Sequence, residues 1–365
     1  MRIEQLTFLR FFAAAVVVVF HYGVEATGLS GFLTAGPQMV TFFFVLSGFV
    51  MTVAYGGKAV RPGAFWAARA ARILPVYFLA LVLIIIAFKL SGEKINPKAL
   101  LLNIFLVQYW VHPHATALNT PGWSLSVEAF FYFTFPFILI LIRRFSISVD
   151  KLLFIAIMLW AITQTVTTVV LSYGFYKGIY SPSHSFIYYF PIPHFCSFLL
   201  GIGGGMVFLT KKDCESGNVY DFIVLMLAAA SLAVLVLMMN NEAAVAKFFK
   251  LNFAFCSSFY APLSAILITA LSLCRLKALR SLLGSKPLVL LGNASYSLYM
   301  LQKPVHAAFL KFFTWNIEIP PLYDFLLYFT LLIAVSIASF LLFEHPLNLF
   351  LRRKLLGASG GATPA

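Results

Sequence analysis

The chain has 365 residues, of which 61% are hydrophobic and only 10% charged, and its formal net charge is +14. Soluble domains carry about 25% charged residues, so this composition excludes an ordinary soluble protein. The basic residues are dispersed among loops between apolar runs, which argues against a nucleic-acid groove and is typical of the positive-inside bias. Long, repeated apolar runs favour helices over barrel strands. We therefore expect an all-α, polytopic membrane helix bundle.

Ten apolar runs can cross a bilayer, which takes about 20 residues of helix. The expected spans are residues 6–24, 39–55, 73–90, 123–142, 149–171, 185–209, 220–239, 252–274, 288–310 and 322–343. Segment 98–111 is too short to cross easily, and we interpret it as a re-entrant or interfacial helix. Ten spans put both termini on the cytoplasmic side, where most Lys and Arg residues then fall. The expected location is a bacterial inner membrane.

Domain organisation is expected to be simple. No internal repeat or soluble domain is visible, so residues 1–355 form one transmembrane domain and 356–365 a flexible tail. The cysteines are Cys196, Cys214, Cys256 and Cys274. None forms a C-x-x-C pair, so we expect neither a disulfide framework nor a metal site. The first apolar run lacks a clear cleavage site and is expected to be a retained span.

The first span carries two ionisable residues, Arg10 and His21. Eleven residues make almost three helical turns, so both side chains project from one face, about 16 Å apart. Such residues are costly within a bilayer unless they face a bundle interior or a wet cavity. The pair therefore marks a functional site.

The third span is preceded by Arg69 and Arg72 in the sequence FWAARAARILPVY. Three residues apart, they share a helix face. Together with Arg10 they could bind phosphates, because guanidinium forks match phosphate oxygens. The alternative is that they only set topology or contact lipid headgroups.

Glu128 is the acidic residue that lies well inside a span. If Trp123 marks the outer interface, Glu128 lies about 7 Å further in, level with His21. A carboxylate can orient an imidazole and fix its tautomer, so we expect Glu128 to orient His21. The alternative is a purely structural polar pair.

Other polar residues occur in apolar surroundings. Ser47 and Gly48 suit either close helix packing or a backbone exposed beside a bound donor. Ser124 and Ser126 could bond back to their own helix or line a polar cavity. Tyr296 and Tyr299 could be interfacial belt residues or substrate contacts.

Together these segments resemble the membrane-bound acyltransferase-3 family. The similarity rests on R-x10-H of the first span, FFFVLSGF, R-x-x-R, NTPGWSLSVEAFFY, GNASYSLYM and a closing Glu344-x-Pro346. These blocks run in order from residue 5 to residue 353. The resemblance implies transfer of an acyl group, usually acetyl from acetyl-CoA, to a hydroxyl of a carbohydrate-containing acceptor.

The resemblance also implies roles for individual residues. His21 would be the catalytic base, oriented by Glu128, and an acyl-histidine intermediate is the competing mechanism. The residues expected at the acyl-CoA are Arg10, Arg69, Arg72 and Ser47. The residues expected at the acceptor are Trp123, Ser124, Ser126, Tyr296, Tyr299 and Gln302.

Two departures from the family matter. The family often has a histidine where this chain has Gln302, and an amide cannot transfer protons. No SGNH-type hydrolase domain follows, so the acyl hand-off is expected to end at the membrane domain. The alternative function is a proton-coupled transporter or flippase of a glycan or lipid-linked intermediate, in which the same residues form a proton relay.

Overall fold

The computed structural model describes residues 3–112, 117–179, 181–213, 217–312 and 319–356. Over these residues the fold is entirely helical, without a strand. The helices are α1 (Glu4–Tyr22), α2 (Val24–Thr27), α3 (Gly36–Tyr55), α4 (Pro62–Leu90), α5 (Pro97–Ile104), α6 (Trp123–Arg144), α7 (Val149–Ser172), α8 (Pro182–Tyr188), α9 (Pro191–Lys211), α10 (Asn218–Asn240), α11 (Glu242–Phe249), α12 (Ala261–Leu273), α13 (Lys277–Leu283), α14 (Lys286–Phe312), α15 (Pro321–Ser339) and α16 (His345–Leu356). The predicted tail beyond residue 356 lies outside the described residues.

Eight of the described helices are long and apolar enough to cross a membrane. A ninth is possible if α12 and α13, which meet at 108°, count as one broken span. The result confirms a polytopic helical bundle. Of the ten expected spans, 288–310 corresponds to α14, a 27-residue helix that carries Asn293, Gln302 and Lys303 and is not among the eight.

The expected span 252–274 is helical only in its second half. Before α12, Ser257 and Ser258 leave helical geometry, and Ser258 has φ +60°. Side chains satisfy the backbone there: Gln164 donates to the Ser257 carbonyl at 3.0 Å, and Trp160 donates to the Ser258 carbonyl at 3.0 Å. Non-helical backbone inside a bundle requires such partners.

Segment 98–111 does not form a spanning helix. It contains α5, whose eight residues extend about 12 Å, and a short 3-10 turn, Gln108–Trp110. Side chains hold it against the bundle: Tyr77 donates to the Asn103 carbonyl at 2.7 Å, and Ser126 donates to the Leu106 carbonyl at 2.6 Å. The segment therefore folds onto the start of α6.

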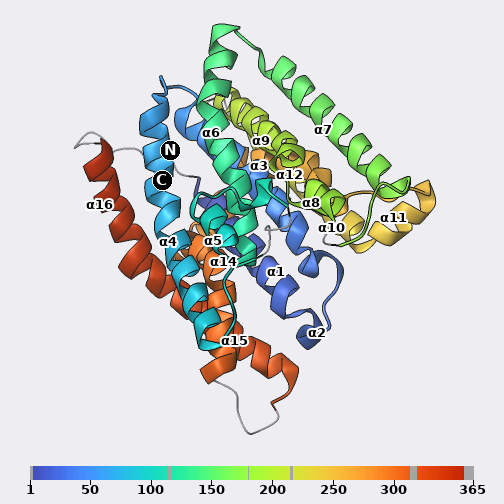
Figure 1. Cartoon of the computed structure of the whole chain (residues 1–365). Helices are drawn as coiled ribbons and strands as arrows, with labels where there is room; N and C mark the ends of the chain where they lie inside the picture. Colours follow the sequence, from blue (N-terminus) through green and yellow to red (C-terminus); the bar gives the residue numbers. More distant parts are fainter. Residues whose placement is uncertain (1–2, 113–116, 180, 214–216, 313–318, 357–365) are drawn as a thin grey trace.

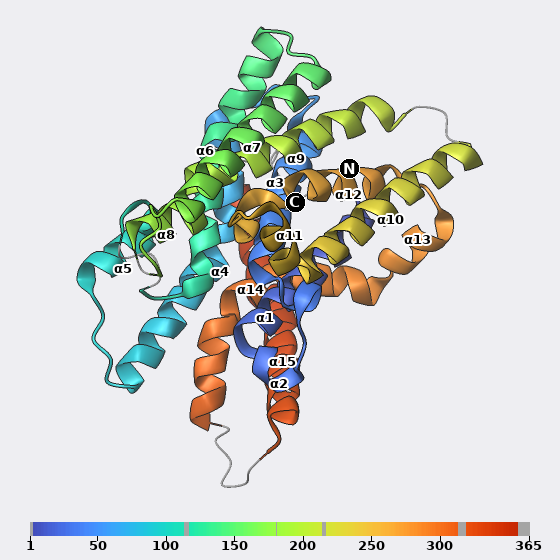
Figure 2. The same ribbon diagram turned by 90° about the vertical axis from the view of Figure 1, so that its right-hand side faces the viewer.

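The arrangement in space brings the first and last described helices to the same part of the bundle. α16 lies beside α4 and packs against it, and α1 packs against α14 (Figure 1). The α14–α15 pair extends away from the bundle at one end (Figure 2). Ile3, before α1, and Arg352, in α16, line the same cavity. The described ends of the chain therefore lie on one side of the bundle.

Backbone contact between α3 and α9 fixes the centre of the bundle. A Cβ atom on Gly48 would collide with the Phe198 carbonyl oxygen, and one on Gly201 would collide with the Val45 carbonyl oxygen. Small residues allow such close approach, which is how membrane helices gain packing energy. This explains the glycine that follows Ser47 in the sequence.

We expect Gly48→Ala to destabilise the protein by about 1–3 kcal/mol, because the two helices must separate to fit the methyl group. Thermal unfolding in detergent would show a lower Tm. Gly63→Ala is the matched control, because a Cβ atom on Gly63, near the start of α4, would have no neighbour within 4 Å. Equal Tm values for both variants would contradict the packing assignment.

Candidate active site

Two adjoining cavities in the bundle share three arginines. The small cavity, of about 140 Å³, and the large cavity, of about 520 Å³, are both lined by Arg10, Arg69 and Arg72. These guanidinium groups therefore lie where the two cavities meet. The structure thus places Arg10 beside the same two cavities as the R-x-x-R pair.

Local structure explains how the arginines reach the cavities. α4 begins at Pro62 and runs for 29 residues, so Arg69 and Arg72 lie within its first three turns on one face. The Arg69 guanidinium lies 5.9 Å from the Phe65 ring centroid. For the residues described, the one ion pair within 4.0 Å joins Lys212 and Asp213. No carboxylate therefore neutralises the three arginines at close range.

The small cavity is lined by polar groups from α3, α6 and α14. Glu128 accepts a 2.6 Å hydrogen bond from the Tyr132 hydroxyl, one turn along α6. Tyr296 donates to the Ile73 carbonyl at 2.7 Å, which ties α14 to α4. The Tyr299 hydroxyl is buried and has no hydrogen-bond partner in the described part of the chain. Ser47 also lines this cavity.

The large cavity also receives side chains from the turn Phe340–Glu344 and from α16, which sequence reasoning did not place at the site. Glu344, Asn348 and Arg352 line it, and each is buried. Ser297 of α14 donates to Glu344 at 2.8 Å. The sequence did contain a sign of this site, because these three polar residues are spaced by four and residues so spaced share one helix face. Arg352 adds a fourth guanidinium to the cavity.

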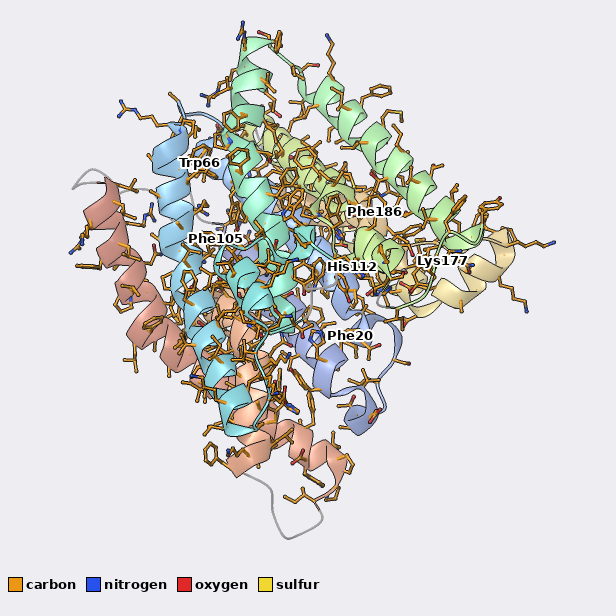
Figure 3. The ribbon with its side chains drawn as sticks, viewed as in Figure 1. Phe20, Trp66, Phe105, His112, Lys177 and Phe186 are labelled. Carbon is orange, nitrogen blue, oxygen red and sulfur yellow. The ribbon has the colours of Figure 1, made fainter. Side chains whose placement is uncertain are left out.

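His21 lies apart from both cavity linings, at the end of α1. Its neighbour Phe20 marks this end, close to α2, in Figure 3. The His21 side chain is exposed, and its Nδ1 atom lies 2.8 Å from Oε1 of Gln302. Gln302 is fully buried. The histidine is thus accessible from the surface and held from inside by α14.

The predicted contact between Glu128 and His21 is wrong. Glu128 bonds Tyr132 and faces the arginine cavity, whereas His21 bonds Gln302. The prediction used Trp123 as an interface marker, but this ring is buried against Phe44. Because α6 begins inside the bundle, Glu128 lies deeper than the count from Trp123 implied.

The remaining predicted acceptor residues divide into two groups. Ser124 lines the small cavity, with Tyr296 and Tyr299. Trp123 packs among aromatic rings, and the Ser126 hydroxyl bonds the Leu106 carbonyl. Neither of these two belongs to the lining of the two cavities.

The chemistry that this arrangement supports follows from charge. Four guanidinium groups and two carboxylates, Glu128 and Glu344, surround connected cavities. A ligand with several negative charges suits such a site, because buried cations need counter-charges. An imidazole held by hydrogen bonding, at some distance from this cluster, suits proton transfer.

Comparisons with known proteins identify the family of the chain. An acyltransferase domain model of the acyltransferase-3 family matches residues 3–345. The acyltransferase MdmB of Streptomyces mycarofaciens is 29% identical over 327 residues, covering 82% of this chain and 78% of that protein. The exopolysaccharide production protein ExoZ of Rhizobium meliloti (strain 1021) is 32% identical over 148 residues, covering 39% of this chain and 45% of that protein.

A putative O-acetyltransferase, SACOL0978 of Staphylococcus aureus (strain COL), is 26% identical over 325 residues. That match covers 82% of this chain and 50% of the relative, so the chain spans about half the length of this longer protein. No solved structure matches the chain. Because the family model covers nearly the whole sequence, the chain belongs to the acyltransferase-3 family of membrane acyltransferases.

Proposed function

We propose that this membrane acyltransferase moves an acyl group, acetyl in the simplest case, from cytosolic acyl-CoA to a hydroxyl of a saccharide or glycan. The observation that carries the proposal is the large cavity, lined by Arg10, Arg69, Arg72 and Arg352 from three helices. CoA bears its negative charge on phosphate groups, which guanidinium forks bind in pairs. The names of the relatives, which include O-acetyltransferase and exopolysaccharide production protein, support the acyl group and the acceptor class.

The donor would enter from the side on which both described chain ends lie. Its phosphates would bind the arginines, and its arm would extend into the small cavity beside Ser47, Ser124 and Tyr299. The acyl end would then approach His21 along the face of α1 that carries both Arg10 and His21. Eleven residues of helix span about 16 Å, a length that an extended pantetheine arm can cover.

The reaction then proceeds as a general-base acyl transfer. His21 takes the proton of the acceptor hydroxyl while the hydroxyl oxygen attacks the thioester carbonyl. The carbon–sulfur bond breaks, and the departing thiolate takes the proton from the imidazole to give free CoA. An acyl-histidine intermediate is the competing route, and rapid acid quenching with mass spectrometry of the His21 peptide would reveal it.

We expect His21→Ala to lower acyl transfer by at least the 10²–10⁴-fold that general-base catalysis contributes. The measurement is transfer of radiolabelled acetyl from acetyl-CoA to saccharides extracted from the host cells, with purified protein in detergent. His112→Ala is the control, because His112 bonds Ser185 at a distance from both cavities. Full activity of His21→Ala would rule out the proposed role.

We expect Arg69→Ala, Arg72→Ala and Arg352→Ala each to weaken acetyl-CoA binding. A hydrogen bond to a charged group contributes about 1.5–3 kcal/mol, which is roughly 10- to 100-fold in Kd. Calorimetric titration of the purified protein would measure the change. Arg144→Ala, at the end of α6 and beside the Phe145 ring, is the control. If the three variants bind acetyl-CoA with unchanged affinity, these arginines serve membrane topology and not donor binding.

A further inference from the structure

The Gln302 side chain uses both ends of its amide. Its Nε2 atom donates to the Tyr299 carbonyl at 2.8 Å, and its Oε1 atom lies 2.8 Å from Nδ1 of His21. The side chain is fully buried. The Gln302 backbone carbonyl accepts a 3.0 Å hydrogen bond from the Tyr328 hydroxyl. The residue is therefore held from three directions.

These contacts determine which nitrogen of His21 carries the proton. A backbone carbonyl can only accept, so the amide nitrogen of Gln302 must face Tyr299 and the amide oxygen must face His21. An amide oxygen also can only accept, so Nδ1 of His21 must be the protonated nitrogen. The neutral imidazole then has its free lone pair on Nε2.

We propose that Gln302 is a positioning residue that fixes His21 in the Nδ1–H tautomer, so that Nε2 is the atom that takes the acceptor proton. This inference rests on the proposed function. Gln302 itself takes no proton, because an amide does not titrate. The proton on Nε2 therefore has one exit in the reaction, the thiolate of CoA, and the Nδ1 proton stays in its hydrogen bond throughout.

The surroundings of Gln302 keep this arrangement rigid. Lys303 donates to the Leu118 carbonyl and to the Thr120 hydroxyl. Asn119 donates to the Met300 carbonyl at 3.0 Å. The turn of α14 that precedes and contains Gln302 is thus fastened to residues 118–120. A fastened partner holds an imidazole in one orientation, as outer partners of catalytic and metal-bound histidines do.

The titratable groups around His21 come from α1, α14 and α15. The ring of Tyr22 is adjacent on α1, and it stacks on His306 with centroids 4.2 Å apart. Tyr328 contacts both of these rings. Lys303 is the charged group that acts on His21 electrostatically. In the described residues no carboxylate lies within 4.0 Å of the imidazole, so a neutral amide holds the position that a carboxylate has in a Ser-His-Asp triad.

The first test is the pH dependence of kcat/KM for acetyl-CoA in the Gln302→Glu variant. A carboxylate stabilises the imidazolium, so the rising limb of the profile should move to higher pH by about 1 unit or more. Tyr328→Phe is the matched control, because it removes a bond to the Gln302 backbone and leaves the side-chain bond intact. It should not move the limb. A Gln302→Glu profile that coincides with wild type would overturn the proposal.

The second variant, Gln302→Met, keeps the length of the side chain and removes both hydrogen bonds. We expect kcat to fall about 10- to 100-fold while KM for acetyl-CoA stays within twofold, because the arginine cavity is untouched. A purely structural role would lower Tm and the yield of folded protein without this split. A raised KM for acetyl-CoA with an unchanged kcat would contradict a positioning role.

A third readout does not need activity. NMR spectra of protein containing isotope-labelled histidine report the tautomer, and a His21→Asn variant assigns the signal. We expect the Nδ1–H form in the wild type and loss of that preference in Gln302→Met. An Nε2–H wild type would refute the proposal even if acyl transfer occurs. Conversely, an inactive wild type with the Nδ1–H form would contradict the proposed function and leave the tautomer assignment standing.

Discussion

The structure depends on keeping three guanidinium charges inside an apolar bundle. Arg10, Arg69 and Arg72 meet where two cavities join, and in the described part of the chain no carboxylate lies within 4.0 Å of them. A bare charge in hydrocarbon is costly, so the bundle must leave space there for water or for an anionic ligand. The larger cavity, of about 520 Å³, provides that space. An anion that enters this cavity binds favourably because the fold already holds the arginine charges in place. In the proposed function, this contact orients the bound donor.

α14 is the element that links the anion cavity to His21. A Cβ atom on Gly292 would collide with the Thr7 carbonyl oxygen, so α14 and α1 are in backbone contact. From this anchor the helix sends Ser297 to Glu344, Tyr299 into the small cavity and Gln302 to His21. Its buried polar residues include Ser295, Ser297 and Gln302. For that reason a helix of 27 residues falls outside the group that is apolar enough to face lipid along its length.

Hydropathy predicted the helices well, because each spanning segment must satisfy its own backbone and present apolar side chains to lipid. Charge and helical spacing, in turn, grouped Arg10 with Arg69 and Arg72. Depth could not be predicted in the same way. The sequence alone indicates that Trp123 marks an interface, but its ring is buried against Phe44 and Tyr109, and Glu128 lines the arginine cavity. Arg352 was missed because its position depends on α16 returning to pack against α4, a contact between distant parts of the chain.

His21 lies outside both cavity linings. The position of Tyr299 therefore matters in the proposed reaction. The small cavity is lined as far as Tyr299 and Met300, whereas Gln302 lies one helical turn further on. Tyr299 is therefore a lining residue of the small cavity that also contacts Gln302. The hydroxyl of Tyr299 is buried and lines the same cavity as Ser124. Its carbonyl, by contrast, holds the Gln302 amide. Tyr299 can thus contact the donor through its side chain, while its backbone carbonyl holds the Gln302 amide that fixes the tautomer of His21.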